Sequence, residues 1–314
     1  MIKQIYTMES LQDYLKCCDL EFIILGASSN IRSYKSLDII ANSKISVSDI
    51  IVLDFVDFAP KKESPYYEDY YSYKCLDLPI TTLLCEQDNI CLDLLSLSKN
   101  SKVAIDITGL NIPALYKIFF ILSEVLGIND FQVFYTEPQF YIFEQGMLDA
   151  YDYLIGDRKY NVIEEYFNSG ENDKEVLVLF LGFDRMTSTM VKEEVNPSTT
   201  YLVNGFPSTS PKLKDISLLN NYELIKKITP QIYNTKANNP FSAYNVLSEI
   251  QRKHPNELIN VCVLGSKPMA LGTCLFALHN KSQVKLSYAF PKGFKERISE
   301  GTATTWHYKV AINT

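Results

Sequence analysis

The sequence predicts an α/β protein built from two tandem Rossmann-like units with mainly parallel sheets. Two observations predict this fold class: apolar runs rich in Ile, Val and Leu alternate with segments of helical character, and the same order of parts occurs twice along the 314 residues. Alternating strands and helices favour parallel sheets with right-handed crossovers, and strands covered on both faces have continuous apolar runs. We expect unit 1 at residues 1–145, a helical connection at 146–173 and unit 2 at 174–314.

Each unit begins with an apolar run that ends in glycine. The runs are EFIILG, which ends at Gly26, and EVLVLFLG, which ends at Gly182. A polar turn with an arginine, a helix-like segment and a second strand-like run follow in both units, and the second runs are DIIVLDFVDF and TTYLVNGFP. In parallel sheets such strand-to-helix turns line the carboxyl edge, where Rossmann-like folds bind their ligands. We therefore expect a binding site at these turns.

The later parts of the two units match in spacing as well as in order. A third apolar run, KVAIDITG or INVCVLGS, leads to a proline that can occupy the first position of a helix. Each helix leads to a strand with a Tyr-x-x-Pro-x-x-aromatic pattern. Tyr135 follows Pro113 by 22 residues, and Tyr288 follows Pro268 by 20 residues. This agreement predicts an internal duplication in which at least four strands of each unit have the same order.

The composition argues against several classes of partner. The net charge is −7 and no Lys/Arg cluster is present, whereas proteins that bind extended nucleic acid need a basic face. A small anionic ligand remains compatible with this charge because helix N-termini bind anions. A partner protein or a homo-oligomer is also compatible with it. The seven cysteines and three histidines lack the spacing of a zinc site, so we predict no metal and no cofactor. No apolar run reaches the roughly 18 residues of a membrane span and the N-terminus lacks a signal-peptide pattern, so we expect a cytoplasmic protein without a membrane partner.

The run LGSKPMALG in unit 2 is the clearest candidate for an anion site. The N–H groups of Gly265 and Ser266, together with the dipole of the following helix, can seat an anion, and Lys267 adds a positive charge. Met269 follows in the first helical turn. In the alternative interpretation, Ser266 does no more than cap the helix. The phosphate-binding pattern G-x-x-x-x-G-K-[ST] does not occur in the chain.

The turns after the first strand of each unit are the second group of candidates. Glycine lets a backbone approach a ligand, hydroxyl groups donate hydrogen bonds, and arginine can bind a phosphate or carboxylate through two parallel hydrogen bonds. The candidate residues are Gly182, Asp184, Arg185, Thr187 and Ser188 in unit 2, and Gly26, Ser28 and Arg32 in unit 1. The alternative is an Asp184–Arg185 surface pair combined with helix capping.

A third turn, in unit 1, contributes Asp106, Thr108 and Gly109. Asp106 ends a strand-like run, and it is either an acceptor for a ligand hydroxyl or a cap for the next helix. No catalytic residue stands out, because the common nucleophile motifs are absent. We interpret the tyrosine-rich stretch 59–73 as a surface loop of unit 1 that folds over the site or against a partner.

The run VCVLGSKPMALG resembles the strand–Gly-Thr-Lys–helix signature of CARF domains, which are Rossmann-like sensors of cyclic oligonucleotides in CRISPR-linked immunity. This chain departs from that signature by having Gly-Ser-Lys. Two such units in one chain also look like the SAVED domains of related antiphage systems. The resemblance implies that Gly265, Ser266, Lys267, Met269 and the turn from Gly182 to Ser188 contact a ligand.

The sequence therefore favours a non-catalytic sensor or accessory subunit that binds a nucleotide-like anionic ligand, in line with an antiphage defence system. The first alternative is an enzyme that acts on a nucleotide or sugar phosphate in a cleft between the two units. The second is an interaction scaffold with a degenerate Rossmann site. Turnover of nucleotides separates the first two functions, and absence of ligand binding together with a stable protein partner favours the third.

Overall fold

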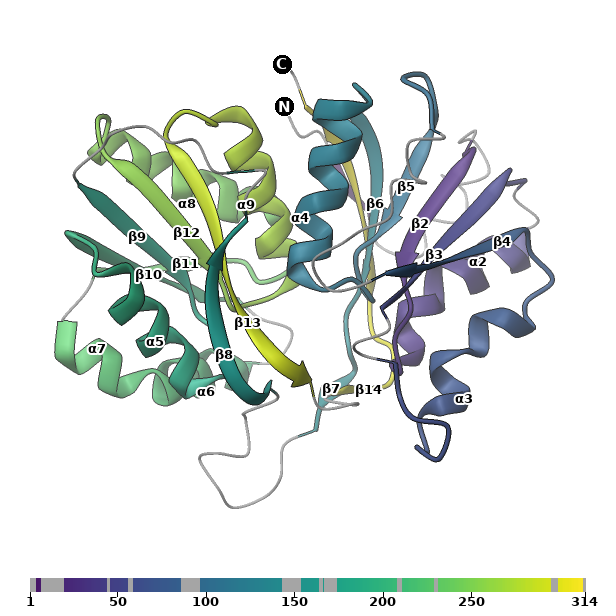
Figure 1. The fold of residues 1–314 in the computed structure, drawn as a ribbon, viewed down its shortest axis with the longest axis horizontal. Coiled ribbons are helices and arrows are strands. Elements are labelled where there is room, and N and C mark those ends of the chain that lie inside the picture. The colour runs from purple at the N-terminus through teal and green to yellow at the C-terminus, as the bar shows by residue number, and fades with distance from the viewer. Residues whose placement is uncertain are drawn as a thin grey trace. The chain divides into compact units, whose positions relative to one another are not determined.

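The computed structural model describes residues 4–6, 20–43, 46–55, 59–85, 97–142, 154–163, 166, 174–207, 211–228, 231–294 and 299–312. The chain divides into two compact units, unit 1 with residues 1–142 and 296–314, and unit 2 with residues 143–295. Each unit is a mainly parallel sheet with helices on both faces (Figure 1), which confirms the predicted fold class.

Unit 1 contains a seven-stranded sheet with the order β1-β15-β6-β5-β2-β3-β4. The strands from β6 to β4 run parallel to their neighbours, whereas β15 pairs antiparallel with both β6 and β1. The strands are β1 (Gln4–Tyr6), β2 (Phe22–Gly26), β3 (Asp49–Phe55), β4 (Ile80–Cys85), β5 (Val103–Asp106), β6 (Asp130–Thr136) and β15 (Thr305–Ala311). The helical segments are η1 (Ile31–Tyr34), α2 (Lys35–Ser43), α3 (Tyr67–Tyr70), η2 (Ser72–Cys75), α4 (Ile112–Phe120) and η4 (Ile121–Val125). A separate two-stranded ribbon pairs β7 (Phe140–Tyr141) with β14 (Ser299–Glu300).

Unit 2 contains a six-stranded sheet with the order β11-β10-β9-β12-β13-β8. All neighbours run parallel except β8, which pairs antiparallel with β13. The strands are β8 (Leu154–Val162), β9 (Glu175–Phe180), β10 (Thr199–Gly205), β11 (Gln231–Thr235), β12 (Leu258–Val263) and β13 (Val284–Phe294). The helices are α5 (Arg185–Val195), α6 (Pro211–Asn220), α7 (Tyr222–Ile228), α8 (Pro240–Lys253) and α9 (Lys267–His279). Helices α5 to α7 lie along one face of this sheet, and α8 and α9 lie along the other (Figure 1).

The two sheets have the same strand order, which confirms the predicted duplication. When the five parallel strands of each unit are numbered along the chain, both sheets read 3-2-1-4-5, and both continue with an antiparallel strand beside the fifth. The prolines also correspond, because Pro113 and Pro268 are each the second residue of their helix, one position later than expected. A proline is tolerated there because the first turn of a helix has no internal partners for its N–H groups.

The two units exchange their sixth strands. The segment after the fifth strand of unit 1 supplies β8, which joins the sheet of unit 2. The segment after the fifth strand of unit 2 supplies β15, which joins the sheet of unit 1. Each sheet is therefore completed by the part of the chain that follows the fifth strand of the other unit.

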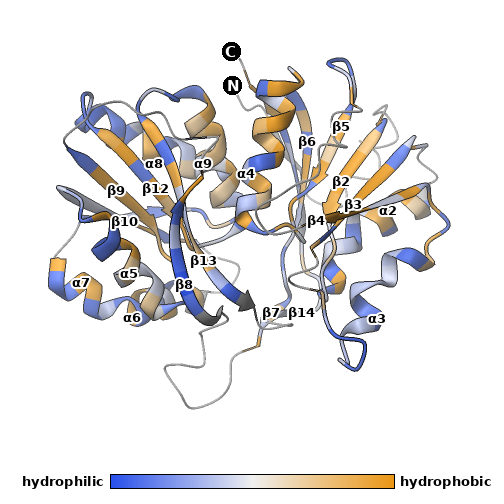
Figure 2. Ribbon diagram, viewed as in Figure 1, coloured by the Kyte–Doolittle hydropathy of each residue, from blue (hydrophilic) through white to orange (hydrophobic). Residues whose placement is uncertain are grey.

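The exchange corrects two of the predicted boundaries. Residues 154–162 form a strand of unit 2 and not part of a helical connection. The last strand, within the predicted unit 2 at 174–314, belongs to unit 1. The sequence LIGDRKYNV of β8 is largely hydrophilic (Figure 2), as an edge strand allows, so it lacks the apolar run by which the other strands were predicted. The rest of 146–173, apart from Ile163 and Tyr166, lies outside the described residues.

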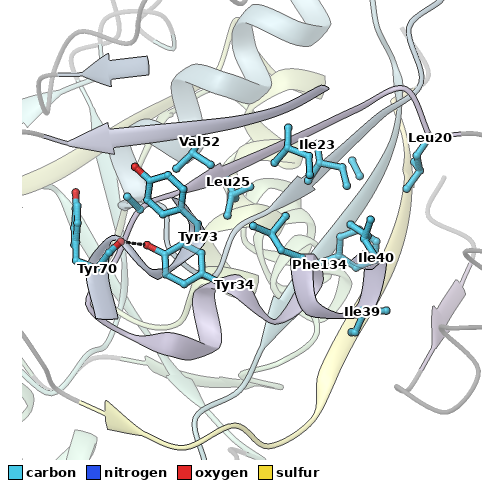
Figure 3. Close-up of a cluster of buried hydrophobic side chains, with 14 residues drawn as sticks. Leu20, Ile23, Leu25, Tyr34, Ile39, Ile40, Val52, Tyr70, Tyr73 and Phe134 are labelled. Carbon is cyan, nitrogen blue, oxygen red and sulfur yellow. Dashed lines mark hydrogen bonds between the residues drawn. The ribbon is translucent and has the colours of Figure 1, made fainter. Parts of the chain in front are cut away.

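The stretch 59–73 is not a surface loop throughout, because two of its tyrosines enter the core of unit 1. Tyr70 and Tyr73 are buried beside Tyr34 and pack with Leu25 and Val52 of the sheet (Figure 3). A tyrosine ring buries a large apolar area while its hydroxyl group finds a polar partner. Polarity along the stretch therefore concealed a segment that covers one face of the sheet.

No helix in the described parts of the chain has the length and apolar character needed to cross a bilayer. Among the same residues, no group of three or more His, Cys, Asp or Glu side chains is placed to hold a metal ion.

Candidate functional site

The turns after the first and fourth parallel strands touch each other at the carboxyl edge of both sheets. In unit 2, a Cβ atom on Gly182 would lie 2.0 Å from the carbonyl oxygen of Leu264. In unit 1, a Cβ atom on Gly26 would lie 2.7 Å from the Gly109 carbonyl oxygen, and one on Gly109 would lie 2.1 Å from that of Gly26. These distances are too short for any side chain, so the three glycines are needed for contact between turns. Their contact with a ligand stays a prediction.

The turn before α9 is capped by Ser266, as the alternative interpretation expected. The Ser266 hydroxyl accepts a hydrogen bond from the Met269 N–H at 3.4 Å and donates one to the Ala237 carbonyl oxygen. Pro268 has no N–H, so this helix start offers fewer donors to an anion than an uncapped one. Lys267 is the first helical residue and is partly exposed at the carboxyl edge. The helix dipole does not favour a cation there, so capping does not explain the lysine.

Met269 and Gly265 have packing roles in this turn. Met269 is buried, and its Cε atom would be 2.6 Å from a Cβ atom on Gly205. Its sulfur would be 2.8 Å from a Cβ atom on Gly265. The methionine therefore fills the space between the ends of β10 and β12. It was predicted as a contact for the ligand, and the contacts that it makes here are with the protein itself.

Asp184 caps α5 and is already paired with a cation. Its Oδ1 atom accepts hydrogen bonds from the N–H groups of Met186 at 2.8 Å and Thr187 at 3.0 Å, and its Oδ2 atom lies 2.8 Å from Arg158 of β8. Burial opposes ionisation of this carboxyl, but the Thr187 N–H and the Arg158 guanidinium outweigh it, so its pKa lies below the usual value. Arg158 is thus the cation paired with Asp184 among the described side chains, and this pair is buried. The side chain of Arg185 lies outside the described structure, so the Asp184–Arg185 pair stays a prediction.

The carbonyl groups of the Gly182–Phe183 turn are held by α6 and the residue after it. The Gly182 carbonyl oxygen accepts hydrogen bonds from Ser217 at 3.1 Å and Asn221 at 3.2 Å, and the Phe183 carbonyl oxygen accepts one from Asn220 at 2.7 Å. Ser217, Asn220 and Asn221 were not among the predicted site residues. The Asn-Asn pair at the end of a helical pattern was the available signal, since asparagine often binds nearby backbone groups.

Three buried polar side chains of unit 2 lie beside these turns. Thr187 and Ser188, both predicted, are fully buried in the first turn of α5. Asn204, which was not predicted, is fully buried near the end of β10. Within the part of the chain that the structure describes, the Ser188 hydroxyl and both polar atoms of the Asn204 amide have no hydrogen-bond partner. The signal for Asn204 was a polar residue at the end of the otherwise apolar run YLVNG.

In unit 1 the predicted residues bind to their own unit. Arg32 is buried, donates to the Thr136 carbonyl oxygen and lies 6.0 Å from the centre of the Tyr135 ring. Thr136 N–H in turn donates to the Thr108 hydroxyl at 2.9 Å. The Ser28 hydroxyl accepts from the Asn30 N–H at 3.2 Å. These side chains hold together the turns at the carboxyl edge.

Asp106 is neither exposed nor the cap of α4. Its carboxylate accepts hydrogen bonds from the Ser36 hydroxyl at 2.5 Å and the Thr108 N–H at 2.9 Å. Burial raises its pKa, which these hydrogen bonds and Arg32 partly oppose. The cap of α4 is Asn111, which accepts from the Ala114 N–H at 2.7 Å. The prediction that Asp106 caps this helix is therefore wrong, and its carboxylate joins α2 to the turn after β5. Its predicted contact with a ligand hydroxyl stays a prediction.

The end of the second strand differs between the units. In unit 1, the Ala27 N–H donates a hydrogen bond to the Leu53 carbonyl oxygen, and in unit 2 the Leu181 N–H donates one to the Val203 carbonyl oxygen. Leu53 and Val203 therefore correspond, and so do the residues that follow them in the second strand, Asp54 and Asn204. Asp54 accepts a hydrogen bond from the Tyr70 hydroxyl at 2.8 Å. The Tyr34 hydroxyl donates to the Tyr70 carbonyl oxygen at 2.5 Å and so fixes this tyrosine (Figure 3). In unit 1 the Tyr70 hydroxyl thus bonds to Asp54, whereas the corresponding Asn204 of unit 2 has no partner among the described residues.

The fold is similar to that of a solved type III CRISPR defence DNA nuclease that is activated by cyclic oligoadenylate. The TM-score is 0.50 at 8% sequence identity, and the match covers 85% of this chain. This chain spans 65% of the length of the nuclease chain. At this identity the similarity is one of fold. A phosphoethanolamine N-methyltransferase from Haemonchus contortus, in complex with phosphoethanolamine and S-adenosylhomocysteine, matches with a TM-score of 0.25 at 10% identity, over 90% of this chain and 68% of that chain.

No family model matches the sequence. No curated protein matches it either.

Proposed function

We propose that the protein is a non-catalytic sensor or accessory subunit that binds a nucleotide-like anionic ligand at the carboxyl edge of the unit 2 sheet. The observation that carries this proposal is the difference between the two units. In unit 1, the side chains of Arg32 and Asp106 are buried, whereas Lys267 of unit 2 is partly exposed at the start of α9. Ligands of open α/β sheets bind outside the carboxyl ends of the strands, at the switch in strand order. In unit 2 that switch lies between β9 and β12.

The similarity of fold supports the class of ligand. The nuclease of similar fold is activated by cyclic oligoadenylate, and a CARF-like sensor of a defence system would bind such a molecule and relay the signal to a partner protein. A cyclic oligoadenylate carries phosphates for a lysine and helix N-termini, and riboses and bases for polar and aromatic side chains. We infer a nucleotide-like ligand on this ground.

The test is calorimetric titration of the wild type and Lys267→Ala with nucleotides and cyclic oligoadenylates. A charge-assisted contact contributes about 1.5–3 kcal/mol, so the variant is expected to bind about tenfold to a hundredfold more weakly. The melting temperature should hardly change, because the dipole at a helix start does not favour a cation. Lys226→Ala, on an exposed part of α7, is the matched control and should bind like the wild type.

Other outcomes point to other functions. If the wild type and Lys267→Ala bind the nucleotides with equal affinity, Lys267 does not contact the ligand. Conversion of a bound nucleotide to a product would favour the enzyme. Absence of binding across the whole series, with a stable protein partner, would favour the scaffold.

A further inference from the structure

Among the described residues of unit 2, Asn204 carries a buried amide whose two polar atoms both lack a hydrogen-bond partner. Its side chain is 0% exposed, and neither its Oδ1 nor its Nδ2 atom makes a hydrogen bond. Buried polar groups in proteins are nearly always paired, because an unpaired one loses its bonds to water without replacement. An apolar side chain of similar shape would be more stable at this position. The amide therefore costs folding free energy that a bound polar group would offset.

The position of Asn204 is one where nucleotide-binding folds recognise ribose. Asn204 lies at the end of the second parallel strand, 22 residues after Gly182. Dinucleotide-binding folds place an acidic residue about 20 residues beyond the glycine-rich turn, where it bonds the ribose 2′-hydroxyl. Asn204 lies on the same face of the sheet as Leu202, which packs with Val191 of α5. The amide thus faces the helix whose first turn holds the unpaired hydroxyl of Ser188.

Unit 1 shows what a partner at this position looks like. The corresponding Asp54 is bound by the Tyr70 hydroxyl at 2.8 Å. The chain between the second and third strands of unit 2 forms α6 and α7 instead. The last residue of α6, Asn220, and the next residue, Asn221, bind the turn carbonyls of Phe183 and Gly182. Among the described residues of unit 2, no hydroxyl group is bonded to Asn204 as the Tyr70 hydroxyl is bonded to Asp54.

The exposed side chains nearby suit a nucleoside with a phosphate. Phe206 follows Asn204 by two residues and is 43% exposed. The ammonium group of Lys214 lies 4.9 Å from the centre of the Phe206 ring and 3.2 Å from the Asp215 carboxylate. Met186, in the first turn of α5, is 63% exposed. An aromatic ring beside a cation offers a base a surface for stacking and a phosphate a counter-charge.

We propose that Asn204 binds a ribose 2′-hydroxyl of the ligand of unit 2, and that Tyr70 closes the equivalent position in unit 1. This inference rests on the proposed function. The amide oxygen accepts the hydroxyl proton and the amide nitrogen donates to a lone pair, so one hydroxyl group can engage both ends of the amide. The protein then binds one ribose of its ligand through unit 2 and none through the corresponding position of unit 1.

The experiment compares cyclic oligoadenylate with its 2′-deoxy analogue as probes for the full-length protein. The wild type is expected to bind the ribose form at least tenfold more tightly. In Asn204→Leu the ribose form should bind at least tenfold more weakly, the 2′-deoxy form should be unaffected, and the melting temperature without ligand should rise. Asn204→Thr, which is smaller and suits a strand, should lose the same preference.

The control is Thr235→Val. The Thr235 hydroxyl is also buried without a partner, but Thr235 pairs with Gly205, whose Cβ direction leads to Met269 on the opposite face of the sheet. The Thr235→Val variant should prefer the ribose form over the 2′-deoxy form as strongly as the wild type does. Equal wild-type affinity for the two probes, or an unchanged preference in both Asn204 variants, would overturn the ribose contact while leaving ligand binding intact. Failure of the wild type to bind either probe would overturn the proposed function as well.

Discussion

His307 is held neutral in the core of unit 1. Its ring is buried against Phe134, with centroids 5.3 Å apart, and its Nε2 atom lies 2.7 Å from the Gln132 side-chain oxygen. Burial lowers its pKa to about 4, and the nearby charge of Lys309 acts in the same direction. The unfolded chain, with a histidine pKa of about 6.5, binds more protons than the folded chain between about pH 6.5 and pH 4. The contribution of His307 to stability is therefore complete above about pH 6.5 and is lost as the pH falls through this window.

We expect His307→Gln to flatten the acid side of the stability curve. The buried histidine should cost the wild type about 2–3 kcal/mol of unfolding free energy between pH 7 and pH 4. Glutamine remains neutral and retains a donor for Gln132, so most of that loss should disappear. Urea unfolding at several pH values measures the difference, and His254→Gln on unit 2 serves as the control. If the unfolding free energy of the wild type and of His307→Gln falls equally between pH 7 and pH 4, His307 is not the cause of the acid loss of stability.

Residue types and positions of the candidate site were predictable, but their partners were not. Asp184 and Ser266 stand at strand-to-helix turns, and both cap the helices that the sequence predicts. The cation beside Asp184 comes from β8, a strand with no apolar run. Similarly, Arg32 binds the end of β6, more than a hundred residues away along the chain. Local patterns do not contain such pairings, because they arise only when the sheet forms.

The segment from α3 to η2 is the clearest difference between the units at the level of elements. Its rings pack on one another and on Tyr34, with centroids of Tyr34 and Tyr73 5.6 Å apart and those of Tyr70 and Tyr71 4.9 Å apart. The Tyr70 hydroxyl is bonded to buried Asp54. Burial and the adjacent Asp54 carboxyl raise the pKa of Tyr70 far above its usual value, so it remains a neutral donor. The segment thus attaches to the sheet through packing and one charge-assisted hydrogen bond.

Tyr70→Phe is expected to destabilise the protein by about 1–3 kcal/mol, because it leaves the Asp54 carboxylate buried with one partner fewer. Thermal or urea unfolding measures the change. Tyr222→Phe, at an exposed position of α7, should have no effect. Adding Asp54→Leu to Tyr70→Phe should recover part of the loss, since both partners are then apolar. Unaltered stability of Tyr70→Phe would mean that the hydrogen bond contributes nothing.

The elements themselves were largely predictable, since eight of the ten parallel strands coincide with predicted apolar runs or with the Tyr-x-x-Pro pattern after a helix. The third strand of each sheet, β4 or β11, was not predicted, because ITTLLC and QIYNT mix polar and apolar residues. Two further strands, β8 and β15, pair with a part of the chain that is distant in sequence. β8 is hydrophilic because one of its edges is unpaired, and the alternation in β15 does not reveal which sheet it joins. Elements that follow one another in the chain usually lie side by side in the fold, and on this basis β15 was predicted to belong to unit 2. The structure assigns it to unit 1.

At the scale of the whole molecule, the exchange of strands means that unit 1 is made from both ends of the chain. β15 lies between β1 and β6, and seven residue pairs from Thr305–Thr136 to Ala311–Asp130 join it to β6. Its side chains Tyr308 and Val310 are fully buried. Without β15, the buried edge of β6 would expose both backbone groups and core side chains to water. Unit 1 therefore depends on a strand that follows unit 2 in the chain.

The exchange predicts how a cut chain behaves. If a protease site is inserted between Ile142 and Phe143 and cleaved after folding, the two pieces should remain one particle in size-exclusion chromatography, because β15 of the second piece stays within the sheet of the first. They should separate once urea unfolds unit 1. The variant Val310→Asp places a charge at a buried position of β15 and so weakens the pairing of this strand. Its cleaved pieces should separate at a lower urea concentration than those of the wild type. Lys309→Asp, on the exposed side of the same strand, should have little effect. Pieces that part from each other in native buffer would contradict the exchange, and pieces held equally well in Val310→Asp would show that β15 is not what joins them.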